Sequence, residues 1–166
     1  MLIRPLDPAT DTAELERFFA GAADYILLER GTAPGPDLLD EFFKDAPPGC
    51  DPTVSARLGL FEAGQLQAIA EMGFGYPQPT DAYLGLMLLH PKARGCGTGV
   101  RLLRHLEALA RGRGMKRMAL AVLEINPRGR AFWEREGFAL ELANREVVLG
   151  GVTRIAHRLV KPLSAP

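Results

Sequence analysis

The chain has 166 residues, with 20 basic and 20 acidic side chains, and hydrophobic residues make up 47% of it. This composition is typical of a folded globular protein with one core, and it excludes a disordered chain. Because the net charge at pH 7 is zero, the whole molecule lacks the field that attracts nucleic acids or membrane surfaces, and we expect neither as a partner.

Other features of the sequence bear on the cellular compartment of the protein and on whether it binds a metal. No apolar run approaches the roughly 18 residues of a membrane span, and the first residues lack the basic and apolar regions of a signal peptide. Cys50 and Cys96 are too few for a disulfide framework or a four-thiolate zinc site. The three histidines show no metal-ligand spacing. The sequence therefore predicts a cytoplasmic protein without a metal.

The first part of the chain mixes a strand with helices. A short strand over 2–6 precedes a helix that Thr10 or Asp11 would cap, with Leu15, Phe18 and Phe19 on its buried face. The apolar spacing predicts a second helix over 36–45.

The remainder alternates strands with two further helices. Apolar residues at every second position predict a hairpin formed by the strands 54–60 and 66–74. Asn126-Pro127 is a strong helix start, since Asn caps a helix and Pro suits its first position. We expect a single α/β domain over 1–166, with one β-α-β crossover in a three-layer arrangement. The other predicted elements are buried strands over 83–89 and 118–123, a helix over 97–113, a helix from 126 to 137, and a closing hairpin of 138–149 and 152–160 turned by Gly150-Gly151.

Charge is distributed unevenly along the chain. Between residues 21 and 51 there are seven acids and two bases, whereas between 89 and 117 there are eight bases and one acid. The first segment suits a cation and the second an anion. Solvated faces of opposite sign are the alternative interpretation.

The segment from Arg94 to Gly99 carries the clearest functional signal. Three glycines, Gly95, Gly97 and Gly99, lie between a predicted buried strand and an amphipathic helix. Their backbone N–H groups and the positive end of the helix dipole form an anion site, which favours phosphate binding over a simple glycine-rich turn. A Walker loop is excluded because Gly-Lys-Ser/Thr is absent. A dinucleotide fingerprint is excluded because Val100 occupies its third glycine position.

The pattern Arg-x-x-Gly-x-Gly resembles the acetyl-CoA motif of the GNAT acetyltransferase superfamily. The strand over 83–91 is similar to the fourth strand of that family. Asn126, followed by the segment 130–138 that ends in Gly-Phe, is similar to the family's next helix. The resemblance covers about half of the chain in the family's order. It implies a mixed, mostly antiparallel central sheet flanked by helices, with a β-α-β acetyl-CoA core.

The resemblance also implies roles for individual residues. The N–H groups of 95–99, with Arg94, would hold the CoA pyrophosphate, and Asn126 would reach the pantetheine while also capping its helix. The Leu89 N–H would donate to the thioester oxygen, and loss of such a donor typically costs about 100- to 1,000-fold in rate. The implied cofactor-binding set is Met87, Leu88, Leu89, Arg94, Gly95, Cys96, Gly97, Thr98, Gly99 and Asn126.

The catalytic residues are less constrained. Trp133 stands where many relatives carry the Tyr that protonates the departing thiolate, and an indole is too weak an acid, so we interpret Trp133 as a core aromatic. Tyr25, near the family's substrate cleft, is the first candidate for that acid. Glu71, on the predicted third strand, is the candidate base if its strand face meets the cleft, and a solvated carboxylate otherwise. Cys96 has no His partner nearby, so we expect direct attack by the amine rather than a Cys nucleophile.

These features predict an acetyl-CoA-dependent N-acetyltransferase that acts on a primary amine in a ternary complex. The acceptor is a small-molecule or peptide amine, and the acidic segment favours a cationic one. Either a monomer or a homodimer fits the sequence. A non-catalytic CoA-binding module of the same fold is the alternative, since the usual Tyr is missing.

Overall fold

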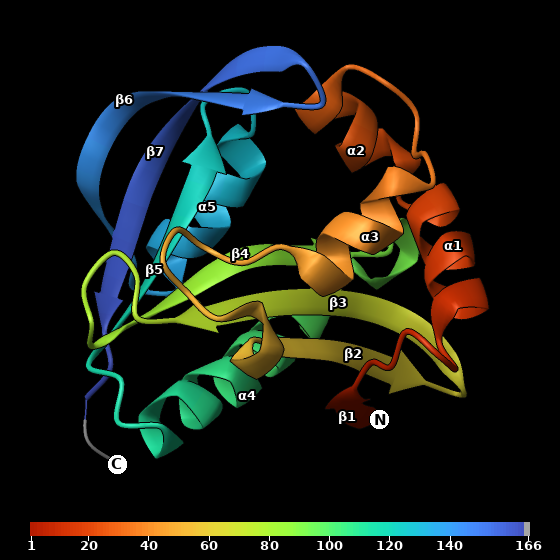
Figure 1. Cartoon of the computed structure of the whole chain (residues 1–166), viewed down its shortest axis with the longest axis horizontal. Helices are drawn as coiled ribbons and strands as arrows, with labels where there is room; N and C mark the ends of the chain where they lie inside the picture. Colours follow the sequence, from red (N-terminus) through yellow and green to blue (C-terminus); the bar gives the residue numbers. More distant parts are fainter. Residues whose placement is uncertain (165–166) are drawn as a thin grey trace.

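The computed structural model describes residues 1–164, and its strands form one sheet in the order β1-β2-β3-β4-β5-β7-β6 (Figure 1). Every neighbouring pair is antiparallel except β4 and β5, which are parallel and joined through a helix. The predicted mixed, mostly antiparallel sheet with one crossover is confirmed. The strands are β1 (Leu2–Pro5), β2 (Ala56–Glu62), β3 (Gln65–Phe74), β4 (Asp81–Leu89), β5 (Arg117–Leu123), β6 (Ala139–Leu149) and β7 (Val152–Pro162).

Helices cover the two faces of the sheet (Figure 1). On one face, α1 (Thr12–Gly21), α2 (Ala23–Arg30) and α3 (Asp37–Lys44) enclose an apolar cluster with Ile69 and Leu88. On the other, α4 (Thr98–Gly112) and α5 (Pro127–Arg135) bury a second cluster that includes Leu106 and Trp133. This arrangement confirms the three layers. Short 3-10 turns occupy Pro52–Val54 and Pro91–Ala93.

Three local details differ from the sequence prediction. Helix α2 was not predicted because its apolar residues are adjacent in sequence, and only Ile26 among them is fully buried. Val54 lies in a 3-10 turn rather than in a strand, and its side chain is exposed. Asp11 holds the N-cap position of α1, yet its carboxylate makes no cap bond because it accepts hydrogen bonds from Arg4 and from the Asp7 N–H.

The parallel pair β4 and β5 separates partway along its length. The two strands pair only where Asp81–Leu84 faces Arg117–Leu120, and the rest of β4 has β3 as its single neighbour. An ion pair holds the closed end: the Arg117 Nε and Nη2 donate to the buried Asp81 carboxylate over 3.0 and 2.7 Å. The open end leaves backbone groups of β4 free to meet a ligand.

We expect Asp81→Ala to destabilise the fold by about 3 kcal/mol, because the substitution removes the buried carboxylate and leaves the partly buried Arg117 with Glu141 as its remaining partner. For a chain of this size the unfolding midpoint should fall by roughly 5–10 °C. The control is Asp40→Ala, which removes an exposed pair with Lys44 and should leave the midpoint almost unchanged. Equal unfolding midpoints for the two variants would contradict the stabilising role assigned to the ion pair between Asp81 and Arg117.

Candidate active site

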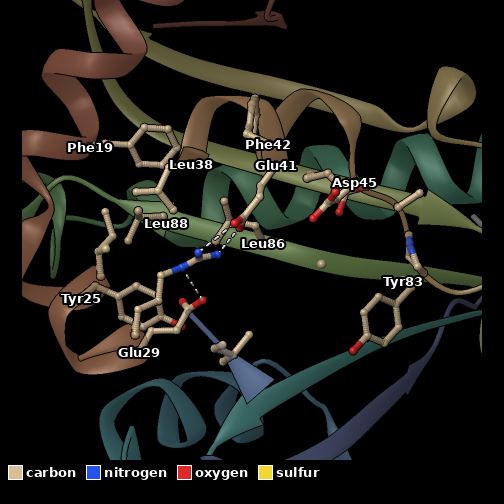
Figure 2. Close-up of a pocket in the computed structure, with 17 residues that line it drawn as sticks. Phe19, Tyr25, Glu29, Leu38, Glu41, Phe42, Asp45, Tyr83, Leu86 and Leu88 are labelled. Carbon is tan, nitrogen blue, oxygen red and sulfur yellow. Dashed lines mark hydrogen bonds and ion pairs between the residues drawn. The ribbon is translucent and has the colours of Figure 1, made fainter. Parts of the chain in front are cut away.

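Two adjoining cavities lie along β4. The larger, of about 780 Å³, occupies the opening between β4 and β5 and is bordered by the glycine segment and the start of α5; we term it the splay cavity. The smaller, of about 280 Å³, lies between β4, α2 and α3 and is termed the helix cavity (Figure 2). Seven residues line both, so the two cavities meet at one place. These are Tyr25, Glu29, Tyr83, Gly85, Leu86, Leu88 and Leu149.

The glycine segment forms one wall of the splay cavity and begins α4. Gly95 and Gly97 have φ values of +80° and +79°, a conformation that only glycine adopts without strain. A Cβ atom at either position would meet no protein atom within 4 Å. Gly97 is the N-cap of α4 without a side-chain cap bond, and the first turn contains no acid. The N–H groups of this turn are therefore available to an anion.

Two residues within the segment face elsewhere. The Thr98 side chain is buried, and its hydroxyl accepts a hydrogen bond from Arg101 over 3.2 Å. Cys96 is exposed, and its sulfur lies near the Lys92 and Arg94 carbonyl oxygens rather than among the cavity-lining groups. Both contribute backbone to the loop, while the cavity wall itself comes from the glycines and Val100.

Arg94 lies at the same wall and connects three elements. Its Nε donates to the Leu89 carbonyl over 3.1 Å, and its two terminal nitrogens donate to the Asp24 carboxylate on α2. The side chain is a quarter exposed. A phosphate reaching Arg94 would share the guanidinium with Asp24.

The second half of β4 forms the floor of the splay cavity. Met87, Leu88 and Leu89 all line the splay cavity, with Met87 and Leu89 packed toward α4 and Leu88 buried toward α1. The His90 N–H donates to the Gln67 carbonyl of β3. Since N–H groups alternate between the two edges of a strand, the Leu89 N–H faces the opening.

The start of α5 closes the opposite side. The Asn126 Oδ1 accepts a hydrogen bond from the Gly129 N–H over 2.9 Å, which confirms the predicted cap, and the residue also lines the splay cavity. Trp133 is 9% exposed and packs edge-on against Phe132 and Phe138. It is a core aromatic, as expected, with one side at the cavity.

Glu71 lies on β3 at the helix cavity. Its side chain is buried, and desolvation, as the largest cause, raises the pKa of the carboxyl to about 7, against the opposing effects of Ser55 and Arg57. Its Oε1 has no hydrogen-bond partner. Gly85 makes room for the carboxylate, because a Cβ there would collide with Glu71 Oε2. The predicted base therefore faces a cavity and not bulk solvent.

Tyr25 lies where the cavities meet, beside Glu29 on the same helix (Figure 2). Burial, with the neighbouring Glu29 charge, raises the pKa of Tyr25 above its usual value. The site thus brings Tyr25 and Glu71 to one cavity, and the glycine segment with Asn126 to the other.

Two further titratable residues at the junction were not predicted as site residues. Glu29 lies on the helix that was missed, so no element placed it near the cleft. Burial raises its pKa. Tyr83 packs against Tyr76 with ring centroids 5.1 Å apart, and burial raises its pKa as well. The sequence signal for Tyr83 was its place on β4, four residues before Met87, the first residue of the implied cofactor-binding set.

Within residues 1–164, no group of three or more His, Cys, Asp or Glu side chains is arranged to hold a metal ion. In the same part of the chain, no helix is both long and apolar enough to cross a membrane.

The family assignment follows from comparison with known proteins. A sequence model of the acetyltransferase (GNAT) family matches residues 11–138. The chain belongs to this family. None of the curated protein sequences matches it at a significant level.

Solved structures agree with the GNAT fold over nearly the whole chain. An acetyltransferase from Thermus thermophilus is 26% identical, with a TM-score of 0.74 and 98% of each chain covered. The ribosomal-protein-S18-alanine N-acetyltransferase from Escherichia coli is 19% identical, with a TM-score of 0.73 over 99% of this chain and 95% of that one. A ribosomal-protein-alanine N-acetyltransferase from Brucella melitensis is 20% identical, with a TM-score of 0.74 over 98% and 100%. The resemblance predicted from the sequence is confirmed for family and fold.

Proposed function

We propose that residues 1–166 act as one N-acetyltransferase domain, which moves an acetyl group from acetyl-CoA to a primary amine by direct attack in a ternary complex. The meeting of the splay and helix cavities at Gly85 and Leu86 carries this proposal. A donor ligand and an acceptor ligand in separate cavities can react only where those cavities join.

The splay cavity fits the donor. At one end, the uncapped N-terminus of α4 and the two positive-φ glycines offer N–H groups and open space to a pyrophosphate. Arg94, which is paired with Asp24, would share its guanidinium with a phosphate, and Cys96 and Thr98 would supply loop backbone. Between the strands, Met87, Leu88 and Leu89 offer apolar surface and free backbone groups along the pantetheine arm, and Asn126 faces it from α5. Bound there, acetyl-CoA supplies the activated thioester.

The protein groups at the junction would then serve the transfer. Glu71 accepts the proton that the attacking amine loses, and a pKa of about 7 leaves its base form abundant at neutral pH. The Leu89 N–H donates to the carbonyl oxygen as the C–N bond forms and the C–S bond breaks. Tyr25, whose raised pKa keeps its hydroxyl protonated, donates a hydrogen bond to the departing sulfur. Because the CoA thiol has a pKa near 8–9, the thiolate gains its proton finally from solvent.

Trp133 supports one alternative function, a domain that binds CoA without catalysing transfer. The indole of Trp133 is too weak an acid to protonate a departing thiolate. The two functions differ in one measurement. An acetyltransferase releases CoA thiol above background when an amine is added, and a binding module does not.

The acceptor is a small-molecule or peptide amine, and a monomer or a homodimer is compatible with the site. The name of the Escherichia coli structure describes a protein that acetylates an alanine of a ribosomal protein. A peptide amine therefore stays among the acceptors to be tested.

We expect acetyl-CoA to raise the thermal unfolding midpoint and NAD to leave it unchanged. A ligand present at about 100 times its dissociation constant adds roughly 2.7 kcal/mol. For this chain length that corresponds to a rise of roughly 5–10 °C. A rise with both ligands, or with neither, would contradict the assignment of the splay cavity to acetyl-CoA.

A further inference from the structure

The walls of the helix cavity are apolar and acidic. Phe19, Ile26, Leu38, Phe42 and Leu88 surround it from three helices and β4. Four carboxylates also line it, and Arg30 is the single basic side chain among the lining residues. The acidic members are Glu29, Glu41, Asp45 and Glu71.

The one cation is already paired. The Arg30 Nη1 donates to Glu41 Oε1 over 3.0 Å, and its Nη2 donates to the other oxygen of the same carboxylate. Its Nε lies 3.7 Å from Glu29 Oε1. Figure 2 shows both carboxylates converging on this guanidinium. The side chain is only 15% exposed, so a ligand carboxylate could reach Arg30 only by displacing Glu41.

Among the acidic side chains, Glu71 differs from Arg30 because one of its oxygens has no partner. Glu71 is 8% exposed and its Oε1 has no hydrogen-bond partner, although it faces the cavity. A buried carboxylate oxygen without a donor is costly. An ammonium or amine group from a ligand would supply that donor.

We propose that the acceptor is a small primary amine with an apolar or aromatic body and without a carboxylate group. This inference rests on the acetyl transfer proposed above and specifies the acceptor class. The amine lies at Glu71, beside the junction of the cavities, and its body lies among Phe19, Leu38 and Phe42. A volume of about 280 Å³ is at the small end of ligand pockets.

The same geometry excludes amino acids as good acceptors. Their carboxylate would enter a cavity lined by four acids, where the one basic lining residue, Arg30, is already paired with Glu41. Glu41 is therefore a specificity-determining residue, because its pairing with Arg30 occupies the one basic side chain among the residues that line this cavity.

The test compares phenethylamine with phenylalanine, which differ by one carboxylate. We expect kcat/KM for CoA release to be at least about tenfold higher with phenethylamine, since a charged hydrogen bond typically accounts for a factor of that size or more. Calorimetry with the full chain saturated with CoA should give the same order of affinities without requiring turnover.

Two variants sharpen the comparison. Glu41→Gln removes the closer of the two carboxylates paired with Arg30 and leaves the 3.7 Å contact with Glu29, so the ratio of kcat/KM for phenethylamine to that for phenylalanine should fall, mainly through improved use of phenylalanine. Asp40→Asn removes the same charge one residue away, where the side chain is 72% exposed and pairs with Lys44, and should leave the preference unchanged. Thermal unfolding establishes that both variants are folded.

Each outcome is decisive. The acceptor class is overturned if phenylalanine is used or bound as well as phenethylamine, if neither amine binds, or if Glu41→Gln leaves the preference unaltered. Selective binding of phenethylamine to the CoA complex without CoA release from acetyl-CoA would support the ligand class and overturn the acetyl transfer.

Discussion

Glu71→Gln is expected to lower the rate of amine acetylation by about 100-fold or more, because general base catalysis typically contributes that much. Gln keeps the size of the side chain but cannot accept the proton of the amine. The measurement is CoA release at saturating acetyl-CoA, with the amine held well below its KM.

The pH dependence gives the sharper result. A base works in its deprotonated form, so the activity of the unsubstituted enzyme should rise with pH through about 7, the pKa of Glu71. The variant should show no such acidic limb. An acidic limb that persists unchanged in Glu71→Gln would remove this residue from the mechanism.

Asp45→Asn provides a matched control for the electrostatics. Asp45 lines the same cavity, and its negative charge raises the pKa of Glu71. Removing that charge makes the Glu71 carboxylate easier to form. The acidic limb should therefore move to lower pH while the rate at high pH changes little.

Measuring the free energy of unfolding distinguishes a catalytic role of Glu71 from a structural one. The pKa of Glu71 is raised from 4.5 to about 7 on folding, so its stabilising contribution is fully present below about pH 4.5 and is lost as pH rises through 7. The loss amounts to about 3 kcal/mol. Glu71→Gln lacks this component and should be no less stable than the unsubstituted protein above pH 7. A lower rate with retained stability assigns the effect to the missing carboxylate.

The sequence predicted those parts of the site that depend on backbone conformation. Gly95 and Gly97 were expected to form an anion nest, and both have the positive φ that requires glycine. Asn126 was expected to cap a helix and does so. Such features follow from local rules of chain geometry, and a local pattern is sufficient to recognise them.

The helix cavity, where we propose that the acceptor binds, could not be predicted to the same depth. Helix α2 has weak amphipathic character, and it is held by contacts from distant segments: Arg154 of β7 donates to the Glu29 carbonyl over 3.1 Å. Without that helix, the positions of Glu29 and Arg30 could not be inferred. The pairing of Arg30 with Glu41 joins residues from two helices and depends on how they pack. Tertiary packing of this kind leaves no signature in a single sequence.

Gly97→Trp is expected to abolish acetyl-CoA binding while the chain stays folded. The Cβ side of Gly97 is open, so an indole would project into the splay cavity where the pyrophosphate is proposed to lie. Losing two charged hydrogen bonds from the N–H nest would weaken binding by at least about 100-fold. The stabilisation by acetyl-CoA in thermal unfolding should then disappear.

A matched variant separates strain from obstruction. Any side chain at Gly97 pays for a φ of +79°, a cost of about 1–2 kcal/mol. Gly114 has a φ of +75°, equally open surroundings and no place in either cavity. Gly114→Trp should therefore lower the midpoint by a similar amount and still respond fully to acetyl-CoA. If Gly97→Trp binds acetyl-CoA as well as Gly114→Trp does, the cofactor lies elsewhere, because strain is common to both variants and only obstruction distinguishes them.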